Sequence, residues 1–185
     1  DTGSLHAEAL EIRAYVEGAR EQVAAFVNAR PAEVVFTSGG TEANNHAIKG
    51  VAASRGHRGR HIITSAIEHP AVEEVCGYLE GLGFTVTYLP VDRDGLVHPE
   101  QVEEAITSET ILVTIMHANN EVGTVQPIEE MASISQEKGI PFHCDAVQGA
   151  GRLPAETWAA ADYISLSAHK LGGPKGIGAL ILRGE

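Results

Sequence analysis

The sequence predicts an α/β fold, a three-layer αβα arrangement in which helices cover both faces of a seven-stranded, mostly parallel sheet. Short β-branched and apolar runs alternate with helical patterns along residues 31–185, which is typical of βαβ units. With 185 residues, 43% of them hydrophobic, the chain can bury one sizeable core. No repeat, low-complexity segment or linker interrupts it. We therefore expect residues 1–185 to form a single domain, with a helix within 1–30 and the sheet within 31–185.

The first predicted element is a long amphipathic helix. Apolar residues recur at alternating spacings of three and four from Leu5 to Phe26, which is the period of a helix face. Ser4 is a candidate N-cap for this helix. The Arg30-Pro31 step ends it, because the residue before a proline avoids helical backbone angles.

After Pro31 the period changes, and strands alternate with helices. The predicted strands are 33–37, 61–65, 84–89, 111–116, 141–145, 163–167 and 177–182, and the helices between them are 41–54, 70–82, 99–106 and 127–138. A short loop rich in glycine and proline joins the last two strands, which makes them candidates for one antiparallel pair. In such sheets ligands bind beyond the carboxyl ends of the strands, so functional side chains are expected in the segments that follow the strands.

Composition excludes several classes of protein. The net charge is −12 with only 13 basic residues, so a nucleic-acid partner is not expected. No apolar run approaches the length of a membrane span, and the N-terminus lacks a signal-peptide pattern. Cys76 and Cys144 are too few for a disulfide framework and lack the CxxC spacing of a zinc site. We therefore expect a cytoplasmic protein with no metal, nucleic-acid or membrane partner.

Two of the predicted strands are followed by segments that could bind an anion or an aromatic ring. After the first strand, Gly39 and Gly40 let the backbone turn tightly, so that a helix N-terminus and the Thr41 hydroxyl could hold a phosphate. An ordinary strand-to-helix turn explains these residues equally well. After the second strand, Pro70 suits the first turn of a helix and puts His69 near the N-cap. That imidazole could stack on an aromatic cofactor, although the segment alone favours a capping role.

Polar side chains also follow two central strands. Two adjacent amides, Asn119 and Asn120, follow the fourth strand, a place where asparagines also stabilise turns. Asp145 ends the fifth strand, which should be buried, and a buried carboxylate is costly unless a cation or donor pairs with it. A pyridinium nitrogen is such a partner. Strand alternation puts His143 on the face of Asp145 and Cys144 on the opposite face, so we expect Cys144 in the core.

A lysine lies just beyond the sixth predicted strand. Lys170 follows Ser167 and His169 and precedes a Gly-Gly-Pro turn, so its amine stands among groups able to hold an anion. Lysine forms Schiff bases with carbonyl cofactors, and pyridoxal 5′-phosphate (PLP) carries both an aldehyde and a phosphate. A surface lysine in a turn is the alternative, and Lys175 lies in the same loop. Lys170 is the stronger candidate because it is nearest the strand end.

These five segments resemble, in order, motifs of the NifS/IscS-type cysteine desulfurases. Those proteins are PLP enzymes of the class V aminotransferase group, with fold type I. The matching strings are SGGTEANN at 38–45, EHPAV at 68–72, MHANNEVG at 116–123, DAVQ at 145–148 and SAHKLGGPKG at 167–176. Because the motifs keep the family order over nearly the whole chain, the resemblance implies the PLP-binding large domain of such an enzyme.

The resemblance implies a role for each matching residue. Lys170 would form the Schiff base with PLP, and His69 would stack on its ring and move protons. Asp145 would pair with the pyridinium nitrogen and Gln148 would bond the phenolic oxygen, while Asn120 would lie near that oxygen and the substrate carboxylate. The remaining residues would hold the phosphate: Gly40, Thr41, Ser167 and His169.

The same resemblance implies conversion of L-cysteine to L-alanine, which leaves a persulfide on an enzyme cysteine for iron–sulfur or thio-cofactor assembly. A homodimer and a sulfur-acceptor or scaffold protein are the expected partners. The family's N-terminal arm would precede this chain, and its small C-terminal domain, with the sulfur-carrying cysteine and an arginine for the substrate carboxylate, would follow Glu185. Neither Cys76 nor Cys144 matches that cysteine. A related class V aminotransferase or lyase, and a cofactor-binding fragment without turnover, are the alternatives.

Overall fold

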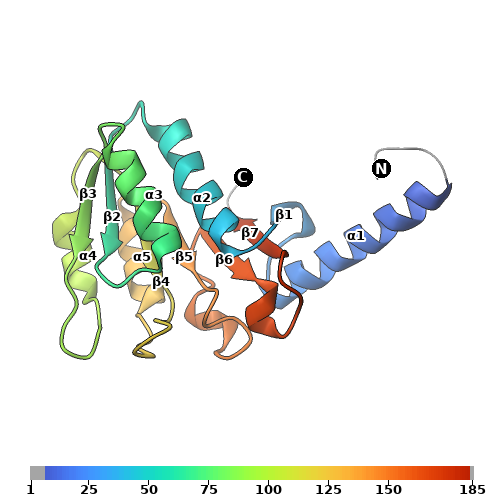
Figure 1. Cartoon of the computed structure of the whole chain (residues 1–185). Helices are drawn as coiled ribbons and strands as arrows, with labels where there is room; N and C mark the ends of the chain where they lie inside the picture. Colours follow the sequence, from blue (N-terminus) through green and yellow to red (C-terminus); the bar gives the residue numbers. More distant parts are fainter. Residues whose placement is uncertain (1–6, 184–185) are drawn as a thin grey trace.

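Figure 1 shows the computed structural model, which describes residues 7–183 as one seven-stranded sheet covered by helices. The strands are β1 (Val34–Thr37), β2 (His61–Ser65), β3 (Thr85–Leu89), β4 (Thr110–Met116), β5 (Phe142–Asp145), β6 (Tyr163–Ser167) and β7 (Gly178–Leu182). The helices are α1 (Ala7–Phe26), α2 (Gly40–Arg55), α3 (Pro70–Glu80), α4 (Pro99–Ala105) and α5 (Ile128–Glu137), with short 3-10 helices η1 (Pro31–Glu33), η2 (Ala155–Thr157) and η3 (Ala168–Leu171). The predicted three-layer αβα class is confirmed.

The strands are ordered β1-β7-β6-β5-β4-β2-β3 across the sheet. Strands β2 to β6 run parallel to one another, and β7 is antiparallel to β6, as the short loop between them indicated. β7 is also antiparallel to β1, a second such pairing that the sequence did not indicate. Within residues 31–185 the predicted bounds differ by two residues or fewer, as where the helix expected over 70–82 ends at Glu80. The first helix ends earlier than predicted, at Phe26 and not at the Arg30-Pro31 step. Asn28 follows it with a φ of 52°, the left-handed conformation that often ends helices. Ser4, the predicted N-cap, lies outside the described residues.

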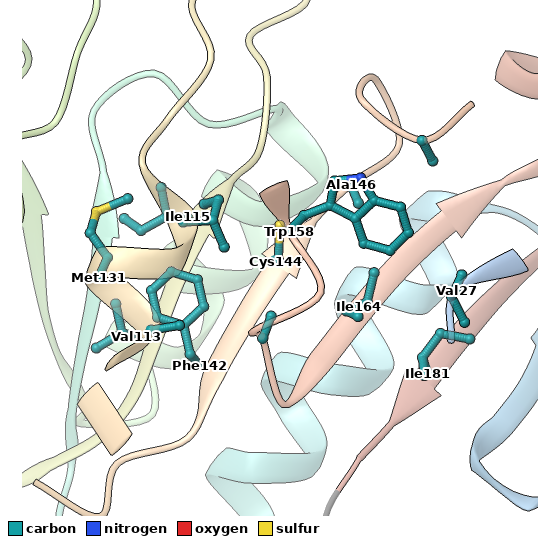
Figure 2. Close-up of a cluster of buried hydrophobic side chains, with 14 of the residues drawn as sticks. Val27, Val113, Ile115, Met131, Phe142, Cys144, Ala146, Trp158, Ile164 and Ile181 are labelled. Carbon is teal, nitrogen blue, oxygen red and sulfur yellow. The ribbon is translucent and has the colours of Figure 1, made fainter. Parts of the chain in front are cut away.

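One face of the sheet is apolar and packs against α1, α4 and α5. Phe142, Cys144 and Ile164 project from β5 and β6 into this layer, and each is fully buried. Figure 2 shows them beside Met131 from α5 and the indole of Trp158. Burial of one large apolar side chain contributes about 1.5–3 kcal/mol. This layer is therefore the larger part of the hydrophobic core.

The opposite face packs against α2 and α3 and becomes polar toward the carboxyl ends of the strands. The fully buried His143 lies between two hydroxyls, with its Nδ1 2.7 Å from Thr114 Oγ1 and its Nε2 2.9 Å from Ser165 Oγ. Burial lowers the pKa of His143 to about 3, so its ring is neutral. A buried polar layer thus crosses β4, β5 and β6 on the same face as Asp145.

Helix α1 leads away from the sheet, and only its C-terminal end packs on the core (Figure 1). Ala24 is buried there, with Val27 just beyond the helix. Leu10, Ile12 and Tyr15 expose 49%, 51% and 72% of their surface. The predicted helix is confirmed, but its N-terminal half presents large apolar side chains that the rest of residues 7–183 leaves uncovered.

The described residues contain neither a membrane-crossing helix nor a metal-binding cluster. No helix within 7–183 is long and apolar enough to span a bilayer. Nor does this part of the chain bring together three or more histidine, cysteine or acidic side chains that could hold a metal ion. Cys76 and Cys144 are both free and buried. The distinctive chemistry of the chain is concentrated at the carboxyl edge of the sheet.

Candidate active site

A cavity of about 190 Å³ opens at the carboxyl edge of the sheet, between the start of α2, the start of α3 and η3. Four further residues contribute to its walls, namely Asn44, Ala71, Met116 and Val147. All nine residues that the sequence singled out as catalytic or cofactor-binding line it: Gly40, Thr41, His69, Asn120, Asp145, Gln148, Ser167, His169 and Lys170. The fold therefore brings five distant segments together at one place.

The start of α2 forms one wall of the cavity. Gly40 packs so closely against the end of the sheet that a Cβ there would lie 2.7 Å from Val147 Cγ2. Only glycine permits this approach without a shift of Val147. The N–H groups of the first helical turn have no partners within the helix and carry partial positive charge, so this wall suits an anion. Ser167 adds a hydroxyl beside it, 2.8 Å from His169 Nδ1.

Lys170 lies on η3, the single turn that follows β6. Gly172 ends that turn at φ 81°, a left-handed conformation that favours glycine. Of the four lysines, Lys170 lines the cavity, whereas Lys175 is exposed in the next loop. Lys49 lies over the ring of Tyr78, with 4.6 Å from its Nζ to the ring centroid. The fold therefore brings Lys170, and not Lys175, to the wall of the cavity.

His69 is the N-cap of α3 and also lines the cavity. Its Nδ1 accepts a hydrogen bond from the backbone N–H of Ala71 at 3.0 Å. This bond fixes the tautomer, because the accepting nitrogen is unprotonated and the neutral ring then carries its proton on Nε2. The capping role and a position at the cavity, which the sequence left as alternatives, are therefore compatible.

Asp145 is 5% exposed and is held by two donors. Its Oδ1 accepts from the backbone N–H of Val147 at 3.0 Å, and its Oδ2 accepts from Asn44 Nδ2 at 2.6 Å. Burial raises the pKa of Asp145, while these two hydrogen bonds and the nearby His69 act in the opposite direction. The carboxyl group is thus desolvated but oriented, at the wall of the cavity.

The two adjacent amides differ in what they do. Asn119 stabilises a turn, because its Oδ1 accepts from the backbone N–H groups of Glu121 and Val122 at 2.9 and 3.0 Å. Its Nδ2 donates to the carbonyl of Ile67 at 2.9 Å. Asn120 instead lines the cavity. The turn interpretation of this pair therefore applies to Asn119, and Asn120 is available to a ligand.

A second buried carboxyl group, Glu68, precedes His69. Its Oε1 accepts from Ser65 Oγ at 2.5 Å and from the backbone N–H of Met116 at 2.9 Å. Burial raises the pKa of Glu68 to about 8, and the nearby Asp145 adds to this rise. Glu68 is therefore mostly neutral at pH 7, and it ties the loop that carries His69 to the end of β4.

Comparison with known proteins identifies the family to which this chain belongs. Residues 2–185 match the family described as aminotransferase class-V. The chain belongs to this family. Among its relatives, cysteine desulfurase IscS from Dictyoglomus turgidum is 52% identical over 181 residues, which cover 97% of this class-V chain and 46% of the relative. The mitochondrial cysteine desulfurase of Drosophila melanogaster is 49% identical over 179 residues, which cover 96% and 39%.

Solved structures of similar proteins extend the agreement from sequence to fold. A NifS-like protein superposes on the class-V chain with a TM-score of 0.95 at 44% identity, covering 99% of this chain and 51% of the other. SspA in complex with cysteine gives a TM-score of 0.92 at 47% identity, covering 97% and 52%. The resemblance to NifS/IscS-type proteins is confirmed. The chain spans about half the length of the curated relatives it matches.

The sequence did not identify two residues: Asn44, which lines the cavity, and Glu68, which is buried next to His69. Asn44 lies inside the SGGTEANN string, and Glu68 opens the EHPAV string, so both belong to motifs that the sequence did single out. A signal for Asn44 was present, because it lies one helical turn after Gly40 and so returns to the face that begins at the cavity. The buried position of Glu68 depends on the end of β4, and the sequence gave no local sign of that contact.

Proposed function

We propose that this chain is the PLP-binding part of a cysteine desulfurase, which removes sulfur from L-cysteine and releases L-alanine. The observation that carries the proposal is the convergence of five strand-end segments on one cavity lined by Lys170. Relatives named cysteine desulfurase at 49% and 52% identity support this activity. The similar SspA, solved in complex with cysteine, supports the substrate.

The residues present fit PLP in charge, space and donor type. The phosphate would lie at the start of α2, where Gly40 lets the helix pack closely on Val147 and Ser167, with Thr41 and His169 beside it. The amine of Lys170 would bond the aldehyde. The carboxylate of Asp145 suits a ring N–H, since burial demands a partner for it. Bound there, PLP would supply a ring that accepts electrons from the α-carbon of an amino acid.

The side chains around that position would hold protons, transfer protons and orient the substrate. Asp145 would hold a proton at the ring nitrogen. Because His69 Nδ1 is occupied by the Ala71 N–H, its Nε2 is the atom that would carry protons to and from the substrate. The amides of Gln148 and Asn120 would bond the phenolic oxygen and the substrate carboxylate.

Neither cysteine of this chain suits the sulfur-accepting step. The nucleophile in that step is a thiolate, and burial raises the pKa of Cys76 to about 12 and that of Cys144 well above its ordinary value. The 185 residues contain no other cysteine. We therefore place the persulfide on a cysteine outside them. Alone, the chain would bind PLP without releasing sulfur, which is the second candidate function.

We propose a single domain that forms a homodimer and delivers sulfur to an acceptor or scaffold protein in the cytoplasm. Exposed apolar side chains on α1, such as Ile12 and Tyr15, support a protein partner, since such surface is normally covered. Two free cysteines fit a reducing compartment, and the charge of −12 disfavours nucleic acid.

Reductive trapping tests the proposed site. The chain is incubated with PLP, reduced with borohydride, digested and mapped by mass spectrometry. We expect the label on Lys170, and none in Lys170→Ala, with Lys175→Ala as the matched control that keeps it. A label on Lys175, or no label at all, would contradict the site. Addition of L-cysteine should release no sulfide, and sulfide release would refute the external position of the persulfide cysteine.

A further inference from the structure

Asn44 is a buried amide that joins α2 to the carboxylate of Asp145. It is 1% exposed, lies in the second turn of α2 and lines the cavity. Its Nδ2 donates to Asp145 Oδ2 at 2.6 Å, across 101 residues of sequence. A buried polar atom normally has at least one hydrogen-bond partner. Asn44 departs from that rule, because its Oδ1 is buried and has no partner among the described residues.

The departure indicates what the amide is for. If it were rotated by half a turn, Oδ1 would face the carboxylate oxygen and two acceptors would oppose each other. The orientation with Nδ2 toward Asp145 is therefore required, and the cost is the unpartnered Oδ1. A side chain that served packing alone would be apolar here, as its neighbours Ala43 and Ala47 are. The hydrogen bond to Asp145 is what an apolar residue could not supply.

We propose that Asn44 is a positioning residue, which keeps the carboxylate of Asp145 ionised and turned toward the ring nitrogen of bound PLP. This proposal rests on the proposed function. Two fixed donors, the Val147 N–H and the Asn44 amide, share the charge of Asp145 and limit its rotation. Without the amide, Asp145 becomes a stronger base and draws the proton away from the ring nitrogen, so the ring accepts electrons less well.

The Asn44 amide shares this task with the Val147 N–H and His69. The titratable groups that interact with Asp145 are Glu68, His69 and Cys144, and His169 and Lys170 line the same cavity. Glu68 is mostly neutral at pH 7, and in its ionised form it would repel the carboxylate of Asp145. The amide also acts at every pH, because it does not titrate.

The test compares three variants of the 185-residue chain in PLP titrations followed by absorbance. Asn44→Leu keeps the branched shape and the number of side-chain heavy atoms and removes the donor. Asn44→Asp sets a second carboxylate against Asp145. Asn45→Leu is the matched control, because Asn45 is the next residue of the same helix and donates to the Thr41 carbonyl instead of to Asp145. We expect Asn44→Leu to weaken PLP binding about tenfold, and Asn45→Leu to stay within about twofold of the parent, a difference near the error of such titrations.

The pH dependence of binding separates positioning from mere packing. Of two facing carboxylates, one has a raised pKa and can donate in place of the amide once it is protonated. The loss of PLP affinity in Asn44→Asp, relative to the parent chain, should therefore shrink as the pH falls from about 8 to about 6. The deficit of Asn44→Leu should stay constant over the same range. A purely structural role would give both variants the same pH-independent deficit.

The outcomes distinguish this inference from the proposed function. If the parent chain binds no PLP, the proposed function fails. If the parent binds PLP and Asn44→Leu binds it equally well while folded, the positioning role is overturned and the function stands. If Asn44→Leu does not fold, as judged by near-UV circular dichroism, the pH series of Asn44→Asp decides. A deficit in that series that does not shrink at low pH also overturns the proposal.

Discussion

Neighbouring residues on β5 lie in opposite surroundings. Cys144 points into the apolar layer with Phe142 and Ile164, as Figure 2 shows. Asp145 lies on the other face, where Asn44 and the backbone of Val147 bond its two oxygens. Both residues are buried, with exposures of 0% and 5%. Burial alone therefore does not distinguish a core residue from a site residue on this strand.

The two faces differ in how many polar side chains they bury, although buried polar atoms without partners occur on both. On the α2 side, buried atoms such as Asn44 Oδ1 and Thr64 Oγ1 remain without partners among the described residues. In the apolar layer Trp158 Nε1 also has no partner among those residues, whereas both ring nitrogens of His143, on the polar face, are bonded. A folded chain tolerates unpaired buried polar atoms at a cost, and they concentrate where a ligand or a reaction uses them. We infer that the apolar face supplies stability and the polar face supplies binding.

The largest expected effect is on the apolar face. Phe142→Ala should lower the free energy of unfolding by about 3–5 kcal/mol, because a fully buried ring leaves a cavity. PLP affinity of the folded fraction should be unchanged. Urea unfolding measures the first quantity and absorbance titration the second. Leu82→Ala, at a side chain that is 53% exposed, is the control for loss of apolar surface. A large loss of PLP affinity in folded Phe142→Ala would break the comparison.

A second effect concerns Glu68 and depends on pH. Its folded pKa of about 8 exceeds the ordinary value of 4.5, so the folded state holds the proton more tightly. Stability from this group is complete below about pH 4.5 and is lost as the pH rises through about 8, at about 1.4 kcal/mol per unit of separation. Glu68→Gln should remove this decline, since an amide remains neutral. Urea unfolding at several pH values measures this difference. If the free energy of unfolding fell equally with pH in the parent and in Glu68→Gln, Glu68 would not be neutral in the folded chain.

A smaller loss should follow from Thr114→Val on the polar face. The substitution keeps the shape of the side chain and removes the hydroxyl that lies 2.7 Å from His143 Nδ1. A buried ring nitrogen without a partner costs about 1–3 kcal/mol. Urea unfolding measures that loss. Thermal or chemical unfolding that matched the parent protein would show that the His143 bonds contribute little to stability.

The smallest effect on stability is expected on α1. Tyr15→Ser should change the free energy of unfolding by less than about 0.5 kcal/mol, because the ring is 72% exposed. If α1 covers a partner subunit, the same change should weaken self-association in analytical ultracentrifugation. Equal association of the parent and Tyr15→Ser would remove α1 from the proposed interface.

Much of this fold was predictable because its rules are local. Strands such as β2 and β6 have the predicted bounds, since each is a short apolar run between turn residues. The pairing of β1 with β7 was missed because it joins the two ends of the chain, and no local pattern specifies such a neighbour. The exposure of Ile12 could not be predicted either, because amphipathic spacing identifies the apolar face of a helix and not what covers that face.

The candidate site was predictable for a geometric reason. The carboxyl ends of parallel strands meet at one edge, so residues chosen there, such as Asp145 and Lys170, fall around one cavity. Asn44 and Glu68 were missed because their importance lies in tertiary contacts, with Asp145 and with the end of β4. Their motifs were visible, but their partners became visible only in the folded chain.

Binding chemistry belongs to one face of the sheet, and the adjacent residues Cys144 and Asp145 on β5 offer the most direct test of this inference. PLP dissociation constants are measured for Asp145→Ala and Cys144→Ala, each confirmed as folded by near-UV circular dichroism. Loss of one partner of a buried charged pair costs about 2–5 kcal/mol, so Asp145→Ala should bind PLP at least about 30-fold more weakly. Cys144→Ala should bind it like the parent chain and lose only stability. Equal losses of affinity in the two variants, or a loss confined to Cys144→Ala, would contradict the account.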